Sequence, residues 1–205
     1  MRHGFTMIEL VIVIGLVTII SLVVGIFSLD VARVGSFIEK SLQNQQSLEV
    51  TFQAMDSEVR SMGPSSLGAY PIESVSTTSL VFFGDIDRNG VFDRVRYFLP
   101  ISATTTVTST LQKGIIVPTG NPLVYATSSE KITVVLRNVI IPTSSPTFEY
   151  FDATYTGSQV AMSYPIDINK IRLIRVNVSA DVNPGVTPKA TFYTTTINIR
   201  NLRSN

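Results

Sequence analysis

The residues with the clearest potential for chemistry are four oxygen-bearing side chains in one short segment, at Asp85, Asp87, Asn89 and Asp93. Together with Gly90, they match positions 1, 3, 5, 6 and 9 of an EF-type calcium loop, in which alternate side chains supply oxygen ligands around a tight turn. The main-chain carbonyl of Val91 stands at position 7. The spacing therefore makes calcium the candidate ligand of this segment, and we expect the protein to require no other cofactor.

Two observations favour a simpler interpretation of the same residues. The twelfth position of a complete loop carries a bidentate Glu, but in this chain it is Arg96. Asp and Asn are also common in turns, because their side chains accept hydrogen bonds from nearby main-chain amides. The alternative is therefore a plain β-hairpin turn in which these residues set the geometry and the solubility.

The composition leaves little room for enzyme chemistry. The chain has 205 residues, no Cys and a single His, His3. Thiol nucleophiles, His-based triads and ordinary zinc sites are therefore excluded from the rest of the chain. Carboxylate or Ser/Lys chemistry has no recognisable motif here, so we expect a protein that is not an enzyme.

The C-terminal part of the chain has a basic bias. Its charged residues include Lys170, Arg172, Arg175, Lys189, Arg200 and Arg203 against Asp181. A basic face attracts phosphates in a salt-dependent way, but no aromatic residues interleave with these cations. A solvated sheet face that balances the acidic stem is the simpler interpretation, and nucleic acid is kept only as an alternative partner.

The element that must position everything else is an apolar run from Phe5 to Leu29, whose only charged residue is Glu9. As a helix it would be about 37 Å long, which exceeds the ~30 Å hydrocarbon core of a bilayer. A carboxylate inside such a run is costly, and intramembrane charges usually have a function and a partner. The run therefore predicts a membrane-spanning helix in which Glu9 has a specific role.

The residues Gly4-Phe5-Thr6-Met7-Ile8-Glu9, directly before this run, resemble the N-terminus of the type IV pilin and type II secretion pseudopilin family. The resemblance implies a leader peptide of residues 1–4, cleavage after Gly4 and N-methylation of Phe5. It also implies that Glu9 neutralises the terminal amine of a neighbouring subunit when helices pack into a filament. Opposite charges attract strongly in a low dielectric, and either charge alone would be costly to bury.

The same resemblance implies a set of partners. These are other pilin or pseudopilin subunits, a prepilin peptidase that also acts as the N-methyltransferase, a platform protein, an assembly ATPase and the membrane itself. Arg2 and His3 on the leader side favour a cytoplasmic N-terminus and an exported head. Assembly would then place the protein in a periplasmic or cell-surface filament.

Other interpretations of the N-terminus remain open. Thr6 and Glu9 fit a capping box, although this does not explain Gly4 and Phe5. A Sec signal peptide would have a shorter apolar core and an A-x-A-like cleavage site, and no such site follows Leu29. The run could also be a plain single-pass anchor for a binding module, such as an adhesin or DNA-binding tip subunit that does not itself polymerise.

Residues 30–62 predict an amphipathic continuation of the helix. Apolar side chains recur in steps of three and four along one face, at Val31, Val34, Ile38, Leu42, Leu48, Phe52, Met55, Val59 and Met62. Met62-Gly63-Pro64 predicts the helix end. We expect this stripe to lie across a sheet, with a coiled-coil partner as the alternative.

Residues 65–205 predict a β-rich globular head. Asn89-Gly90 between two β-rich runs, Ser79–Ile86 and Val91–Leu99, is a strong hairpin signal. Further strands are predicted at Val107–Leu111, Gly114–Val117, Leu123–Ala126, Lys131–Ile141, Thr147–Phe151, Ile168–Ser179 and Ala190–Asn201. The predicted fold class is α+β, with a long N-terminal helix packed on an antiparallel sheet.

A second, looser resemblance concerns the subtype of pilin. Residues 148–152, 171–178 and 194–201 look like the head of J- or W-type minor pilins, which implies a subunit at or near a filament tip. Many major pilins carry a proline near the twenty-second mature position, where this chain has Ile26. Both features favour a minor pilin or pseudopilin over a major subunit.

Overall fold

The computed structural model describes residues 6–100, 108–141, 146–181 and 190–199. The predicted leader and Phe5 lie outside these residues. The chain divides into two compact units, Met1–Gln43 and Asn44–Asn205. Helix α1 (Met7–Arg60) supplies the described part of the first unit and the beginning of the second. The second unit is the head.

The described residues of the head form one sheet of eight antiparallel strands with a helical segment packed on it, which confirms the predicted α+β class. The strand order is β1-β2-β3-β4-β5-β7-β6, and β8 pairs with β7. The strands are β1 (Ile72–Val75), β2 (Ser79–Gly84), β3 (Asp93–Phe98), β4 (Thr108–Ile116), β5 (Lys131–Ile140), β6 (Phe148–Phe151), β7 (Leu173–Ala180) and β8 (Thr191–Asn198). Two short 3₁₀ turns, η1 (Thr127–Ser129) and η2 (Ile168–Lys170), precede β5 and β7.

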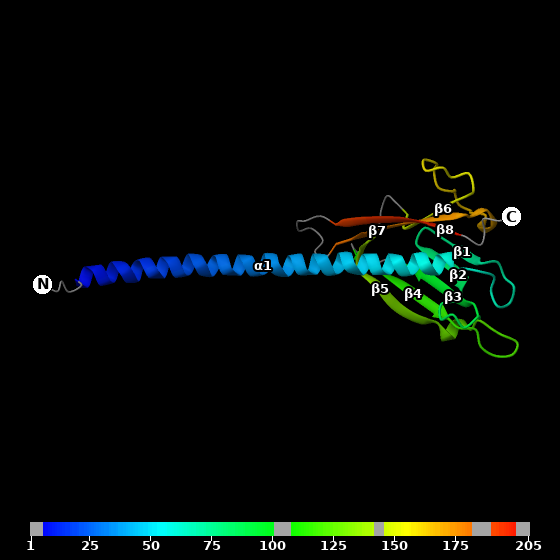
Figure 1. The fold of residues 1–205 in the computed structure, drawn as a ribbon, viewed down its shortest axis with the longest axis horizontal. Coiled ribbons are helices and arrows are strands. Elements are labelled where there is room, and N and C mark those ends of the chain that lie inside the picture. The colour runs from blue at the N-terminus through cyan, green and yellow to red at the C-terminus, as the bar shows by residue number, and fades with distance from the viewer. Residues whose placement is uncertain (1–5, 101–107, 142–145, 182–189, 200–205) are drawn as a thin grey trace. The chain divides into compact units, whose positions relative to one another are not determined.

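The sheet curls around the last turns of α1. Figure 1 shows β1–β5 on one side of this segment and β6–β8 on the other. Side-chain contacts confirm both sides, because the Thr51 hydroxyl donates to the Val135 carbonyl on β5 and the Phe52 ring stacks on Tyr193 of β8. The helix therefore fills the concave face of the sheet and supplies the centre of the core.

The distal part of the predicted apolar stripe forms this core. Its side chains are at most 2% exposed, at Leu48, Phe52, Met55, Val59 and Met62. The helix ends at Arg60, two residues before the predicted end. The reason is that Met62 pairs with Gly84 in an isolated bridge and the Gly63 amide donates to the Phe83 carbonyl, so the chain leaves the helix to run beside β2.

The predicted hairpin is confirmed, and three strand predictions are corrected. Strands β2 and β3 pair antiparallel from Ser79–Phe98 to Gly84–Asp93, with the turn between them. The predicted strands Val107–Leu111 and Gly114–Val117 are corrected to one continuous strand, β4, which runs from Thr108 to Ile116; Val107 lies outside the described residues. The predicted strand Leu123–Ala126 is absent, and Val124 forms only an isolated bridge with Thr119. Strand β1 was not among the predicted strands.

Candidate functional site

The first turn of α1 is closed by Thr6 and Glu9. The Thr6 amide and hydroxyl both donate to Glu9 Oε2, each at 2.9 Å, and the Glu9 amide donates to the Thr6 hydroxyl at 3.4 Å. This is a reciprocal capping box, as the spacing of the two residues predicts. It places the only carboxylate of the apolar run at the very start of the helix. Gly4 and Phe5 lie outside the described residues.

The helix behind this turn is apolar on every side. From Met7 to Leu29, its large apolar side chains are between 49% and 87% exposed. By length and composition, α1 is long and apolar enough to cross a membrane, and no second helix of the described residues qualifies. Such a surface is stable only in contact with lipid or with other apolar surfaces.

The predicted stripe divides into two parts along the helix. Val31, Val34, Ile38 and Leu42 are all more than 50% exposed, whereas the positions from Leu48 onward are buried in the head. The prediction that the whole stripe lies across the sheet is therefore correct only for its distal part. We call the four exposed residues the proximal stripe.

The predicted calcium-loop residues form the turn between β2 and β3. Asp85 Oδ1 accepts the Asn89 amide at 3.0 Å and Asp85 Oδ2 accepts the Gly90 amide at 3.0 Å. Asp87 accepts the amide and the side chain of Asn89, and Asn89 Oδ1 accepts the Val91 amide. Arg88 and Gly90 both have positive φ, at 59° and 84°. We call residues 85–93 the acidic turn.

Asp93 differs from the other members of the acidic turn. Asp93 is only 2% exposed, and its Oδ1 atom is buried without a hydrogen-bond partner in the structure. Burial, and then the charges of Asp87 and Asp85, raise the pKa of its carboxyl to about 6, while a hydrogen bond from the Ile86 amide and the charge of Lys113 act the other way. The spacing of these residues places Asp93 in the turn but does not predict its burial.

The calcium prediction is not decided by this geometry. Within the described residues, no group of three or more Asp, Glu, His or Cys side chains is arranged to hold a metal ion. The hydrogen bonds of Asp85, Asp87 and Asn89 are those that a plain turn also makes. Any cation site here must therefore combine carboxylates with amide and main-chain oxygens.

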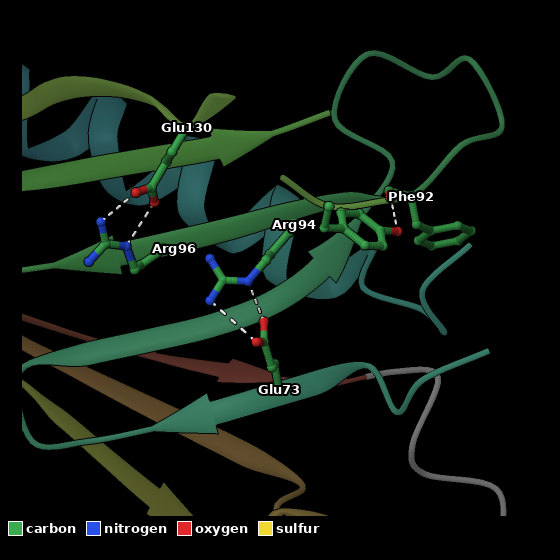
Figure 2. Close-up of polar contacts among 6 residues, drawn as sticks. Glu73, Phe92, Arg94, Arg96 and Glu130 are labelled. Atoms are coloured by element: carbon green, nitrogen blue, oxygen red, sulfur yellow. Dashed lines mark hydrogen bonds and ion pairs between the residues drawn. The ribbon is translucent and has the colours of Figure 1, made fainter. Parts of the chain in front are cut away.

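Arg96, at the position of the missing last ligand, is held away from the acidic turn. Its guanidinium donates to both carboxylate oxygens of Glu130, at 2.8 and 2.7 Å, and Arg94 makes a similar pair with Glu73. Figure 2 shows the two pairs side by side on adjacent parts of the sheet. Because side chains alternate along a strand, Arg94 and Arg96 point to the face opposite Asp93.

A buried polar cluster inside the head was not predicted. Glu58 of α1 accepts from Lys113 Nζ at 2.5 Å and from the Tyr97 hydroxyl at 2.6 Å. Both charged side chains are less than one-fifth exposed. Burial and the neighbouring Glu58 raise the pKa of Tyr97 well above its usual range. The cluster fixes α1 to β3 and β4, which is a structural role.

The described basic residues of the C-terminal part make ion pairs, hydrogen bonds or ring contacts with other residues of the head. Arg175 pairs with Glu149 at 3.3 Å and lies over the Phe151 ring, and Arg172 donates to the carbonyls of Asn169 and Ile171. Lys170 is 3.8 Å from Asp167. Lys189, Arg200 and Arg203 lie outside the described residues. This arrangement favours the interpretation of a solvated, internally balanced sheet face.

No family model matches this chain, and no curated protein or solved structure matches it significantly. A functional proposal therefore depends on the N-terminal motif and on the geometry of the described residues.

Proposed function

We propose that this protein is a structural, non-enzymatic subunit of a pilin-type filament, either a minor pilin or a pseudopilin. It is stored in the membrane through residues 5–29, processed after Gly4, N-methylated at Phe5 and assembled through its N-terminal helix. Its partners are other pilin-type subunits together with the peptidase, platform protein and ATPase that such assembly requires.

The observation that carries this proposal is the combination of Glu9 and the exposed apolar helix. The helix presents large apolar side chains on all sides from Met7 to Leu29, and its only acidic residue before Asp30 lies in the first turn. Lipid can cover the apolar surface of the helix but cannot neutralise the charge of Glu9. A second helix with a positive N-terminal amine would cover the apolar surface and neutralise Glu9, and this is the arrangement that the resemblance implies.

The proximal stripe supports assembly in preference to a simple anchor. An anchor needs apolar residues only as far as the membrane extends, yet Val31, Val34, Ile38 and Leu42 continue an apolar face beyond Asp30. A one-sided stripe at helical period is typical of a helix that packs against another helix. A membrane-tethered binding module that does not polymerise is the competing function.

Two substitutions of Glu9 separate its charge from its capping role. Glu9→Gln keeps a side chain that can complete a capping box but removes the charge, whereas Glu9→Ala removes both. We expect both variants to remain in the membrane and to be missing from filaments sheared from the native host, as measured by immunoblot of the two fractions. Glu39→Gln, on the exposed helix surface, is the matched control and should assemble normally.

The competing functions predict other results. If Glu9 acts only as a cap, Glu9→Gln should assemble like the parent while Glu9→Ala fails. If the protein is a tethered module, neither substitution should change its distribution between the fractions. Either result would contradict a charge-dependent role of Glu9 in assembly.

A further inference from the structure

We propose that β8 is a docking edge through which two copies of this chain pair, with their β8 strands antiparallel, so that the sheets of two heads continue into one another. This inference concerns the head. It does not depend on whether the protein polymerises, because it starts from the edges of the sheet and not from the N-terminal helix.

Strand β8 is an edge strand over its whole length. Its residues pair with β7 from Thr191–Ala180 to Asn198–Leu173, and no strand of the described residues pairs with its other side (Figure 1). An edge strand presents a row of unpaired main-chain N–H and C=O groups, which is a template for another strand. The outward side chains of β8 are uncovered as well, since Phe192 is 63% exposed and its neighbours on the same face, Thr194, Thr196 and Asn198, are also exposed.

Two other edges of the sheet carry features that discourage pairing with a further strand. Strand β1 has only four residues, follows Pro71, contains a register shift against β2 and carries the charge of Glu73. Strand β5 pairs with β7 only near its end, and its free part contains Lys131, Arg137 and register shifts against β4. Short strands, bulges and charged side chains are the means by which proteins protect exposed sheet edges from other chains.

Strand β8 has none of these protective features. Its sequence, Thr-Phe-Tyr-Thr-Thr-Thr-Ile-Asn, contains no charged residue and no Pro, and its register against β7 is continuous. Every residue except Asn198 is β-branched or aromatic, and such residues favour strands. A long, regular and uncharged edge in a natural protein is therefore best explained by a partner strand.

The composition of β8 also makes the strand complementary to itself. In an antiparallel pair of two copies centred on Thr194, Phe192 of each copy lies opposite Thr196 of the other, and Thr194 meets its own counterpart. Cross-strand pairs of an aromatic with a β-branched residue, and of two Thr residues, are favourable in sheets. No charge within the strand opposes this arrangement, whereas an acidic or basic partner strand would find no counter-charge in β8. A second copy is therefore the partner that fits this edge.

Attachment to a membrane would strengthen such a contact. One pair of strands buries less surface than a stable dimer interface requires. Helix α1, however, is long and apolar enough to cross a membrane, and copies held in one membrane meet at a raised effective concentration. We therefore expect the pairing for the full-length chain in a membrane.

Cysteine cross-linking tests the pairing directly, because the chain has no Cys of its own. Membranes that contain full-length Thr194→Cys are treated with a short bifunctional maleimide and analysed on denaturing gels. Opposite Cβ atoms are about 5 Å apart and diagonal ones about 7–8 Å, so the reagent also reaches a register one residue away. We expect a strong dimer band, whose mass identifies a second copy. Ser74→Cys, an exposed position on β1, is the matched control and should give none.

A second substitution makes the test specific for the edge. Phe192→Lys, combined with Thr194→Cys, removes the aromatic pair and adds a charge that protects the edge. It should abolish the dimer band and leave the melting temperature unchanged, because the Phe192 side chain is largely exposed. Equal cross-linking of Thr194→Cys and Ser74→Cys, a product whose mass is not that of two copies, or a dimer band that Phe192→Lys leaves unchanged would overturn the proposal.

Discussion

The proximal stripe and the distal end of α1 have the same apolar periodicity but opposite surroundings. Ile38 is 51% exposed, whereas Phe52, fourteen residues further along the same helix, is 2% exposed. The distal residues are covered by their own chain, because the sheet curls around them. The proximal residues have no cover among the described residues of this chain, and their apolar surface is available to a partner outside it.

This difference shows that one sequence pattern can encode two kinds of packing. Buried apolar area stabilises a helix in the same way whether the cover comes from its own sheet or from another molecule. The two regions differ in the step at which their apolar surface becomes buried. Residues 48–62 are buried when the head folds, and in our proposal residues 7–42 are buried when subunits assemble. Substitutions in the two regions should therefore affect different measurements.

The largest expected effect contrasts the two regions directly. Phe52→Ala should lower the free energy of unfolding of the head by about 3–5 kcal/mol, because it leaves a cavity between α1 and Tyr193. Ile38→Ala should change it by less than about 0.5 kcal/mol but should reduce incorporation into filaments. Urea unfolding in micelles and filament shearing measure the two quantities. Equal losses of unfolding free energy in Phe52→Ala and Ile38→Ala would contradict the difference between the two regions.

A smaller effect is expected for the polar residues of the two regions. Glu58→Gln leaves Lys113 partly buried without its counter-charge and should cost about 2–3 kcal/mol of unfolding free energy. Asp30→Asn, whose pair with Arg33 has side chains 63% and 80% exposed, should cost less than about 0.5 kcal/mol. Adding Lys113→Met to Glu58→Gln should recover part of the loss, and additive losses in this double-mutant cycle would contradict direct coupling.

The smallest effect concerns pH and the buried carboxyl of Asp93. The raised pKa of Asp93 means that the folded state holds the proton of this carboxyl more tightly than the unfolded state, whose pKa is 3.8. This contribution to stability is complete below pH 3.8 and is lost as the pH rises through about 6. Asp93→Asn should remove that slope and stabilise the head at pH 7 by about 1–2 kcal/mol. A parent stability that rises between pH 4 and pH 6, with the variant unchanged, would contradict the burial of a charged Asp93.

Local signals account for what the sequence predicted well. The capping residues Thr6 and Glu9, the long apolar run and Asn89-Gly90 each act within a few residues, and each is present in the structure. The α+β class followed from a helical period that gives way to short β-rich runs. These features need no knowledge of distant contacts.

The features that were missed depend on contacts between distant parts of the chain. Periodicity alone does not say whether Val34 packs on its own sheet or on a partner. Gln112 and Lys113 were left between two predicted strands, although the structure pairs both residues with β3 and with β5. The Glu58–Lys113 pair joins residues 55 positions apart. The alternation of Asp93, Val95 and Tyr97 along β3 was the one available hint that an acid points inward.

The measurement that tests the proposed function most directly is the intact mass of the mature protein, purified from the membranes of its own host or of a host that has a prepilin peptidase. The proposal predicts a chain that lacks Met1–Gly4 and carries one additional methyl group at Phe5. An uncut chain, under conditions in which the same peptidase processes a known prepilin, would contradict it. The protein would then be a membrane-tethered domain, and the role of Glu9 in assembly would have to be abandoned.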